Sequence, residues 1–442
     1  MTALQLAEKL RRKELSAVEA ARASLKVVAE KNPQLQAFVE LDEKRALAAA
    51  EAADRLIARG GDLPVFLGVP SGIKDHEHMK GMGTRAGSKT LQWVRVPFDS
   101  KIAARCRKGG LNLLGKLSCS EMTILPFVDV GWHGPTRNPV NPAHYSGGSS
   151  GGCSCAVAAG MLPIAPGSDG AGSIRLPAAW CGLTGFKPGR GAIFHDHGIV
   201  DPIEMSSIGP LAHDVRDSAA MLDVFAGHYT VNDRGPWSKA CDEQPKPLKV
   251  KLCVTSPITP VDPEIAQAVK RAGALLTALG HRVEEGDPLV GSVEDFLPLM
   301  ARMVRGVPVL PWAEKNLQPT TRWMREEGRK VSRAQLFAAA RALEAKVLKW
   351  FGDADVWLLP SCAKTAPKVG EFDALDGPGV FHAVVPLGAF TAPFNASGQP
   401  AVSLPAGNSS AGLPIGVQLV GRQGQDFALM SLSAQLERAL RG

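Results

Sequence analysis

The chain has 442 residues, of which 45% are hydrophobic and 21% are charged, a composition typical of a globular protein with a large core. Lysine and arginine outnumber aspartate and glutamate only by 50 to 43, and the formal net charge of +7 comes without a run of basic residues, so we expect no nucleic-acid-binding surface. No stretch approaches the roughly 20 apolar residues that cross a bilayer, and no hydrophobic signal core is present, so we expect a cytoplasmic protein without membrane contact. The eight cysteines lack zinc-type spacing, so we expect them to be free thiols.

The first 60 residues are predicted to form an N-terminal helical region. Ser16 and Glu19 form a capping-box pattern at the start of one helix, and we expect Asn32-Pro33 to end it. An alanine-rich helix follows over residues 43–59 and is closed by two glycines.

Three apolar runs in the next hundred residues are predicted as buried strands. They cover residues 65–69, 111–115 and 162–165, and the first is a strand edge that leads to Lys74. Between the last two, residues 149–160 are predicted to form a helix of very small side chains, which can pack closely against a sheet.

The second half of the chain alternates between strand and helix patterns. A strand over residues 249–254 is followed by a helix that begins at Asp262-Pro263 and ends at Gly280, and the next strand begins at His281. This β-α-β unit predicts that part of the sheet is parallel.

The remaining elements follow in order to the C-terminus. The chain is mostly helical over residues 295–350, and then come strands over 356–360, 401–404 and 415–419 and a closing amphipathic helix over 427–440. No internal repeat or long linker divides the chain, so we expect residues 61–442 to form one large α/β domain.

A glycine- and serine-rich stretch over residues 146–152, a second one over 167–175 and the upstream Lys74 are the candidates for chemistry. A serine hydroxyl becomes a nucleophile only when a base takes its proton, and a lysine can be that base if burial keeps it neutral. Small residues also let successive backbone N–H groups converge on one anion. The glycine-rich stretches lack the P-loop and dinucleotide patterns, so from the residues alone they are either an anion-binding loop or a nucleophile loop.

Three ordered motifs carry a resemblance to a known family. They are a G-V-P-x-x-x-K-D segment ending at Asp75, a G-G-S-S-G-G segment at 147–152, and a D-x-G-x-S-I-R-x-P segment at 169–177 with one change in its loop. Residues 391–400 and 412–418 match closing motifs of the same family. The chain resembles the amidase signature family, which implies a serine hydrolase with a single α/β/α domain around a mixed, twisted β-sheet and no cofactor.

The resemblance also implies roles for individual residues. Ser173 would be the nucleophile, and Lys74 would be the base. Ser149, which would follow a cis peptide bond from Gly148, would relay the proton of Ser173 to Lys74. The backbone amides of the oxyanion hole would be those of Gly170, Ala171, Gly172 and Ser173.

Three further residues would support this centre. By the same resemblance, Ser150 orients the network, and Asp169 and Arg175 hold the nucleophile loop. The loop departs from the family pattern, because Gly170 stands where many members have threonine and Ala171 where glycine is usual. Since an oxyanion hole uses backbone groups, we expect both changes to be tolerated.

The substrate is predicted to be a small, apolar amide or carbamate. In the family, the segment before the glycine-rich loop lines the acyl side, and residues 121–128 are mostly apolar here. The candidate substrate contacts are Glu121, Met122, Leu125, Phe127, Val128 and Trp180. We therefore expect hydrophobic amides, anilides or urethanes as substrates, as for an aryl acylamidase or a urethanase, with esterase activity besides.

A methionine- and tryptophan-rich helical stretch at about 290–350 has two interpretations. The side chains of Met300, Met303, Trp312, Trp323 and Met324 could cover the substrate or belong to the core.

Two other functions remain alternatives: a glutaminase-type A subunit of a tRNA-dependent amidotransferase, and a catalytically inactive binding member. The pairs His76/His78 and His195/His197 have zinc-like spacing, but no third ligand follows at a motif spacing, so we expect no metal. We expect a monomer or a homodimer.

Overall fold

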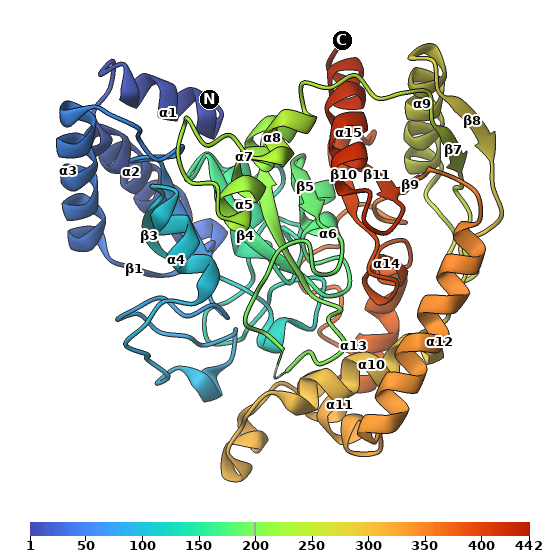
Figure 1. Ribbon diagram of the computed structural model, residues 1–442. Helices are drawn as coiled ribbons and strands as arrows, with labels where there is room; N and C mark the ends of the chain where they lie inside the picture. The colour runs from blue at the N-terminus through green and yellow to red at the C-terminus, as the bar shows by residue number, and fades with distance from the viewer. Residues whose placement is uncertain (199) are drawn as a thin grey trace.

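The computed structural model describes residues 1–198 and 200–442, and Figure 1 shows their arrangement. The α-helices are α1 (Ala3–Arg11), α2 (Ala17–Leu35), α3 (Glu43–Arg59), α4 (Lys101–Lys108), α5 (Gly151–Ala158), α6 (Arg175–Cys181), α7 (Val215–Ala226), α8 (Pro236–Ala240), α9 (Pro263–Ala278), α10 (Val293–Gly306), α11 (Pro319–Arg329), α12 (Arg333–Phe351), α13 (Gly377–Val384), α14 (Pro393–Ala396) and α15 (Asp426–Arg441). The short 3-10 helices are η1 (Lys89–Leu91), η2 (Glu121–Thr123), η3 (Pro311–Asn316) and η4 (Val385–Gly388). The strands are β1 (Phe38–Leu41), β2 (Pro70–Lys74), β3 (Asn112–Leu117), β4 (Ile164–Asp169), β5 (Thr184–Lys187), β6 (Ser207–Ala212), β7 (Lys249–Leu252), β8 (Arg282–Glu285), β9 (Val356–Pro360), β10 (Ala401–Asn408) and β11 (Pro414–Gly421).

The strands form two sheets. The smaller sheet has the order β1-β3-β2, with β2 parallel and β1 antiparallel to β3. The larger sheet has the order β4-β6-β5-β10-β11-β9-β7-β8, in which β7 is parallel to both β8 and β9 and the other pairs are antiparallel. The prediction of a mixed α/β fold is confirmed.

The predicted β-α-β unit is present as β7, α9 and β8. Asp262 accepts a hydrogen bond from the backbone N–H of Glu264 at 2.9 Å, and Pro263 occupies the first turn of α9. Strand β8 then pairs in parallel with β7, with Lys249 opposite Arg282. The capping residues therefore predicted the start of the crossover helix correctly.

The N-terminal region differs from its prediction at two points. The capping box at Ser16 is confirmed, because its hydroxyl accepts from Glu19 N at 3.1 Å and the Glu19 carboxylate accepts from Ser16 N at 2.8 Å. However, α2 continues through Pro33 to Leu35 and ends at Gln36, whose φ is 55°. A proline this close to the end of a helix removes one backbone hydrogen bond and leaves little helix to disrupt. The short strand β1, which follows α2, was not predicted.

The N-terminal helices pack on the rest of the molecule. Leu6 and Leu10 of α1 belong to one hydrophobic cluster with Phe66 and with residues of the large sheet. The backbone N–H of Ala3 donates to the Asp217 carboxylate at 2.5 Å, in the first turn of α7. Residues 1–60 therefore share the main core.

Strand β2 begins later than predicted, and its position sets up the site. Residues 65–69 form turns instead, with Val69 N donating to Phe66 O and Gly68 at a φ of +83°. The strand proper is Pro70–Lys74, and the Ser71 hydroxyl donates to the Ile164 carbonyl of β4 at 2.9 Å. This contact joins the two sheets and brings the ends of β2 and β4 together.

The chain over 293–351 is mostly helical, as predicted. Figure 1 shows α10, α11 and α12 at one end of the molecule, away from α1, α2 and α3. Among the described residues, no helix is both long enough and apolar enough to cross a membrane.

Candidate active site

Lys74 is the last residue of β2 and is buried. Its Nζ lies 2.8 Å from Ser149 Oγ, 2.8 Å from Ser168 Oγ and 3.5 Å from the Ser168 carbonyl oxygen. It has no ion pair within the described part of the chain. Burial lowers the pKa of Lys74, because the ammonium form loses its hydration. A neutral amine can satisfy all three contacts, because its two N–H groups donate to two of the oxygens and its lone pair accepts a hydrogen bond from a hydroxyl.

The neighbouring Asp75 does not offset this effect by pairing with Lys74. Its carboxylate lies 3.6 Å from Lys116 Nζ and 3.5 Å from Arg85 Nη1. Burial raises the pKa of Asp75 to about 6 in spite of these two cations. The lysine that pairs with Asp75 is thus Lys116, and Lys74 remains among hydroxyl groups.

Ser149 and Ser150 come from the loop directly before α5. The Gly148–Ser149 peptide bond is cis, as the family resemblance implies. A Cβ atom at position 148 would lie 2.6 Å from the Leu125 carbonyl oxygen, so only glycine allows this close approach. The Ser150 hydroxyl donates to the Ser168 carbonyl at 3.1 Å and accepts from Ser168 N at 3.3 Å. Ser150 therefore fixes the end of β4 that carries Ser168.

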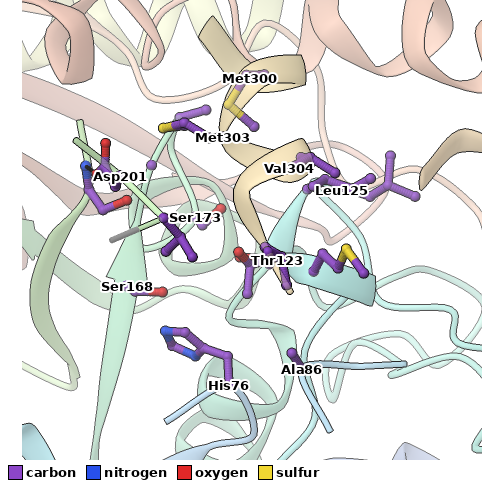
Figure 2. Close-up of a pocket in the computed structure, with 18 of the residues that line it drawn as sticks. His76, Ala86, Thr123, Leu125, Ser168, Ser173, Asp201, Met300, Met303 and Val304 are labelled. Carbon is purple, nitrogen blue, oxygen red and sulfur yellow. Dashed lines mark hydrogen bonds between the residues drawn. The ribbon is translucent and has the colours of Figure 1, made fainter. Parts of the chain in front are cut away.

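Ser173 lies on the wall of a cavity that Ser149 and Ser168 also line (Figure 2). Its residual exposure is 9%. Among the described residues, Ser149 and Ser173 form no hydrogen bond with each other. The structure thus brings Lys74 and Ser149 into contact and places Ser173 on the same cavity.

The backbone amides of the nucleophile loop differ in their availability. The amides of Gly170, Ala171 and Ser173 donate to no described residue. The Gly172 amide, in contrast, donates to Asp169 Oδ1 at 2.6 Å, so its prediction as an oxyanion donor needs correction. Gly172 instead provides the turn, at a φ of +123°.

A buried ion pair holds this loop. Arg175 Nε donates to Asp169 Oδ2 and Arg175 Nη2 donates to Asp169 Oδ1, each at 2.9 Å, and both side chains are inaccessible to solvent. Burial alone raises the pKa of Asp169, but the charge and hydrogen bonds of Arg175 outweigh it and hold the pKa well below its usual range. The Asp169 carboxylate also accepts from the backbone N–H of Ile174 at 3.2 Å.

Four functional residues were not predicted. Asn395 donates to the Asp169 carbonyl at 2.7 Å, Gln418 accepts from Arg175 at 2.7 Å, and the Thr391 hydroxyl donates to the Ala171 carbonyl at 2.7 Å. These three lie in the closing motifs, whose polar residues were the only sign of a role. The fourth is Ser168, which is separated from Lys74 by more than 90 positions and was hidden by its place inside a strand.

The cavity has a volume of about 590 Å³ and a largely apolar wall. Met122 and Leu125, two of the candidate substrate contacts, line it together with Phe296, Met300 and Met303 from α10. Figure 2 shows Met300, Met303 and Val304 facing the cavity across from Ser173 and Ser168. Arginine and lysine are absent from the described lining.

Four other predicted substrate contacts are wrong, because their side chains are committed elsewhere. The Glu121 carboxylate is buried and accepts from Ser88 Oγ and from Gln318 N, each at 2.7 Å. Phe127 stacks on two other rings, Val128 is fully buried, and Trp180 donates its ring N–H to the Lys364 carbonyl at 3.0 Å.

The side chains of the methionine- and tryptophan-rich stretch have different positions, some on the cavity wall and some in the core. Met300 and Met303 line the cavity. Met324 of α11 is buried behind them, Trp323 packs on the Phe381 ring at 5.2 Å, and Trp312 is 71% exposed. Helix α10 thus forms one wall of the cavity, and α11 packs against α10.

The chain is similar to known proteins over nearly its whole length. The family model described as "Amidase" matches residues 19–430. A putative amidase, AmiA2, of Mycobacterium tuberculosis is 35% identical over 99% of this chain and 92% of the relative. The 6-aminohexanoate-cyclic-dimer hydrolase of a Pseudomonas species is 34% identical over 98% of this chain and 94% of its own length.

Solved structures show the same similarity. A 6-aminohexanoate cyclic dimer hydrolase complexed with substrate superposes with a TM-score of 0.89 at 32% identity, covering 100% of this chain and 97% of the other. A bacterial aryl acylamidase of the amidase signature family superposes with a TM-score of 0.87 at 25% identity, covering 99% and 96%.

Proposed function

The chain belongs to the amidase signature family of hydrolases that act on amide C–N bonds, and from this premise we propose that it hydrolyses amides with a bulky, apolar acyl group. The observation that carries the proposal is the buried contact of Lys74 Nζ with Ser149 Oγ, on a mainly apolar cavity that Ser173 shares. Anilides and carbamates of the same apolar character belong to the proposed substrate class.

The first half of the proposed reaction forms an acyl-enzyme. Ser173 Oγ attacks the substrate carbonyl carbon as its proton passes to Ser149 Oγ, and the proton of Ser149 passes to neutral Lys74. The negative charge on the carbonyl oxygen is stabilised by the free amides of Gly170, Ala171 and Ser173. The C–N bond then breaks, and the leaving amine takes the proton back through Ser149.

The second half returns the enzyme to its starting state. Water attacks the ester carbonyl of acylated Ser173, and the same relay accepts its proton. The carboxylic acid leaves as Ser173 Oγ regains a proton. Ser168 is a positioning residue in this scheme, because its hydroxyl is hydrogen-bonded to Lys74 Nζ and keeps the lysine amine directed at Ser149.

Two observations support an apolar acyl group. The wall formed by α10, η2 and α13 is made of methionine, valine and phenylalanine side chains, with Thr123 as its one polar residue among those described. A free amino acid such as glutamine would bring a carboxylate into a cavity whose described lining offers it no arginine or lysine. The named activity of the cyclic-dimer hydrolase, whose substrate has aliphatic chains, is in keeping with this proposal.

A series of p-nitroanilides with acyl chains of increasing length tests the substrate class. Each buried methylene contributes about 0.8 kcal/mol, so kcat/KM is expected to rise about fourfold per methylene until the cavity is full. Met303→Gln, which keeps the side-chain length but makes the wall polar, is expected to flatten this dependence. The neighbouring Arg302 is not part of the described cavity wall, so Arg302→Gln serves as the matched control and is expected to leave the dependence intact.

Other outcomes of the same assay would contradict the proposal. Rates independent of chain length in the wild type would show that the cavity does not hold the acyl group. Faster release of ammonia from glutamine than of aniline from any anilide would favour the glutaminase alternative.

The pH dependence of the reaction is expected to follow Lys74. Only the neutral amine accepts the relayed proton, and burial lowers the pKa of Lys74, so kcat/KM should rise with pH through one ionisation that lies below the free-lysine value of about 10.4. The measurement is a kcat/KM profile of wild-type enzyme in chelator-containing buffers. A flat profile, or one set by an ionisation near the histidine value of about 6.5, would contradict the lysine mechanism.

A further inference from the structure

Three side chains with metal-binding atoms converge at the edge of the cavity. His197 Nε2 lies 2.7 Å from Glu77 Oε1, and His76 Nε2 lies 3.4 Å from the same oxygen. One ligand atom from each of the three residues lies within 4.8 Å of the others. The sequence pairs His76 with His78 and His195 with His197 at zinc-like spacing, and we expected no metal there. The fold instead combines one member of each pair with Glu77.

These separations suit a small divalent cation. A tetrahedral zinc ion with bonds of about 2.0–2.1 Å to nitrogen and oxygen holds neighbouring ligand atoms about 3.3–3.4 Å apart. The 3.4 Å between His76 Nε2 and Glu77 Oε1 matches this value. The 2.7 Å between His197 Nε2 and Glu77 Oε1 is that of a hydrogen bond, which a cation would replace after small rotations of the two side chains. Two histidines and one glutamate are also a donor set that zinc uses in proteins.

The state of His76 points in the same direction. Both of its ring nitrogens are buried, and neither forms a hydrogen bond to any described residue. A buried polar atom left without a partner destabilises the folded protein, because it has lost its hydrogen bonds to water. A bond from one of these nitrogens to a cation would remove that cost at one position.

The surrounding residues hold the other two ligands in place. Lys116 Nζ donates to the backbone carbonyl of Glu77 at 2.6 Å. The His197 backbone N–H donates to His195 Nδ1 at 3.4 Å, and His195 Nε2 is in turn 3.0 Å from the Ser206 carbonyl oxygen. Such outer contacts orient metal ligands.

We propose that His76, Glu77 and His197 form a site for a divalent cation of the zinc type, with its fourth position open to the cavity. His76 and His197 both line the cavity that Ser149 and Ser173 also line. Figure 2 shows His76 on the cavity wall, near Ser168. A cation held by three protein ligands would take its fourth ligand, water or a substrate heteroatom, from this side. The proposal is independent of the amide hydrolysis proposed above, which uses no metal.

Calorimetric titration of the chelator-treated enzyme with Zn²⁺ tests the site. We expect one ion per chain in the wild type and a Tm that rises with Zn²⁺. His76→Ala is the key variant, because it removes a ring that makes no hydrogen bond to the described residues, so its fold should persist. Losing a mere hydrogen-bond partner of a metal ligand costs roughly 10–100-fold in affinity, so we expect His76→Ala to weaken binding by at least about 100-fold.

Two further variants complete the test. Glu77→Gln keeps the shape of the side chain but removes its charge, and we expect the same loss of binding. His78→Ala is the matched control, because its ring lies on the same loop but contacts Thr84 Oγ1 at 3.1 Å, and we expect it to retain binding. Bound Co²⁺ should give the intense visible absorption of tetrahedral coordination in the wild type and in His78→Ala alone.

The opposite results would overturn the proposal. These are no stoichiometric Zn²⁺ binding by the wild type, undiminished binding by folded His76→Ala and Glu77→Gln, or equal loss of binding in His78→Ala.

Discussion

Replacing Ser173 by alanine, or Lys74 by methionine, is expected to abolish amide hydrolysis while the protein stays folded. Ser173→Ala removes the proposed nucleophile, and Lys74→Met fills the same buried space without a group that can accept the proton from Ser149. Removing one member of such a catalytic unit costs on the order of 10⁴–10⁶ in rate. Lys74→Arg should not restore activity, because a guanidinium stays protonated inside proteins.

The measurement is kcat/KM on an apolar anilide, with circular dichroism to check the fold. Ser154→Ala is a suitable control, because the hydroxyl of this buried serine in α5 donates to the Ser146 and Gly151 carbonyls. A serine-directed phosphonofluoridate should modify Ser173 in the wild type. Retention of more than a few per cent of activity by Ser173→Ala, or labelling of Cys153, Cys155 or Cys181 in place of Ser173, would refute the assignment.

Replacing Arg175 by methionine is expected to destabilise the fold strongly. This side chain donates five hydrogen bonds in the buried network around Asp169, and its loss leaves the Asp169 carboxylate charged and without its cation. Breaking a buried pair from one side costs about 3–5 kcal/mol. Arg175→Lys should recover little of this, because an ammonium cannot make the two parallel bonds to the carboxylate. The free energy of unfolding in urea measures the effect.

A surface pair offers a matched control for this experiment. Arg216 Nη1 lies 2.9 Å from Asp242 Oδ1, the same separation as between Arg175 and Asp169, but the two side chains are 54% and 44% exposed. Arg216→Met should therefore cost no more than about 1 kcal/mol. Equal effects of Arg175→Met and Arg216→Met would show that the buried network does not hold the loop.

Local sequence patterns predicted the elements whose limits depend on nearby residues. The caps at Ser16 and Asp262 and the parallel pairing of β7 with β8 are present as predicted. The apolar run over 65–69 failed as a strand, because hydrophobicity shows that a segment is buried and does not show which conformation it has. The Asn32-Pro33 pair failed as a helix end because a single missing hydrogen bond is a small penalty in a last turn.

Predictions of substrate contacts were less accurate than those of the centre itself. Met122 and Leu125 face the cavity, but Phe127, Val128 and Trp180 are in the core. All five are apolar and lie in or near the same motifs, so composition cannot separate them. Which side of a loop faces a cavity depends on the chain packed behind it.

The sequence by itself determined the α/β class, the membership in a hydrolase family and the two glycine- and serine-rich loops. These features could be predicted because they depend on the residue types at neighbouring positions: glycine for the backbone conformation, and serine and lysine for the chemistry. Only the tertiary structure decided which groups meet. It placed Ser168 against Lys74, turned Asp75 toward Lys116, drew Asn395 and Gln418 to the loop of Asp169, and joined His76 and Glu77 with His197. These contacts join residues that are far apart in the chain, or side chains that point away from the residue next to them in sequence. The sequence pattern allows many such pairings equally, and tertiary packing selects one of them.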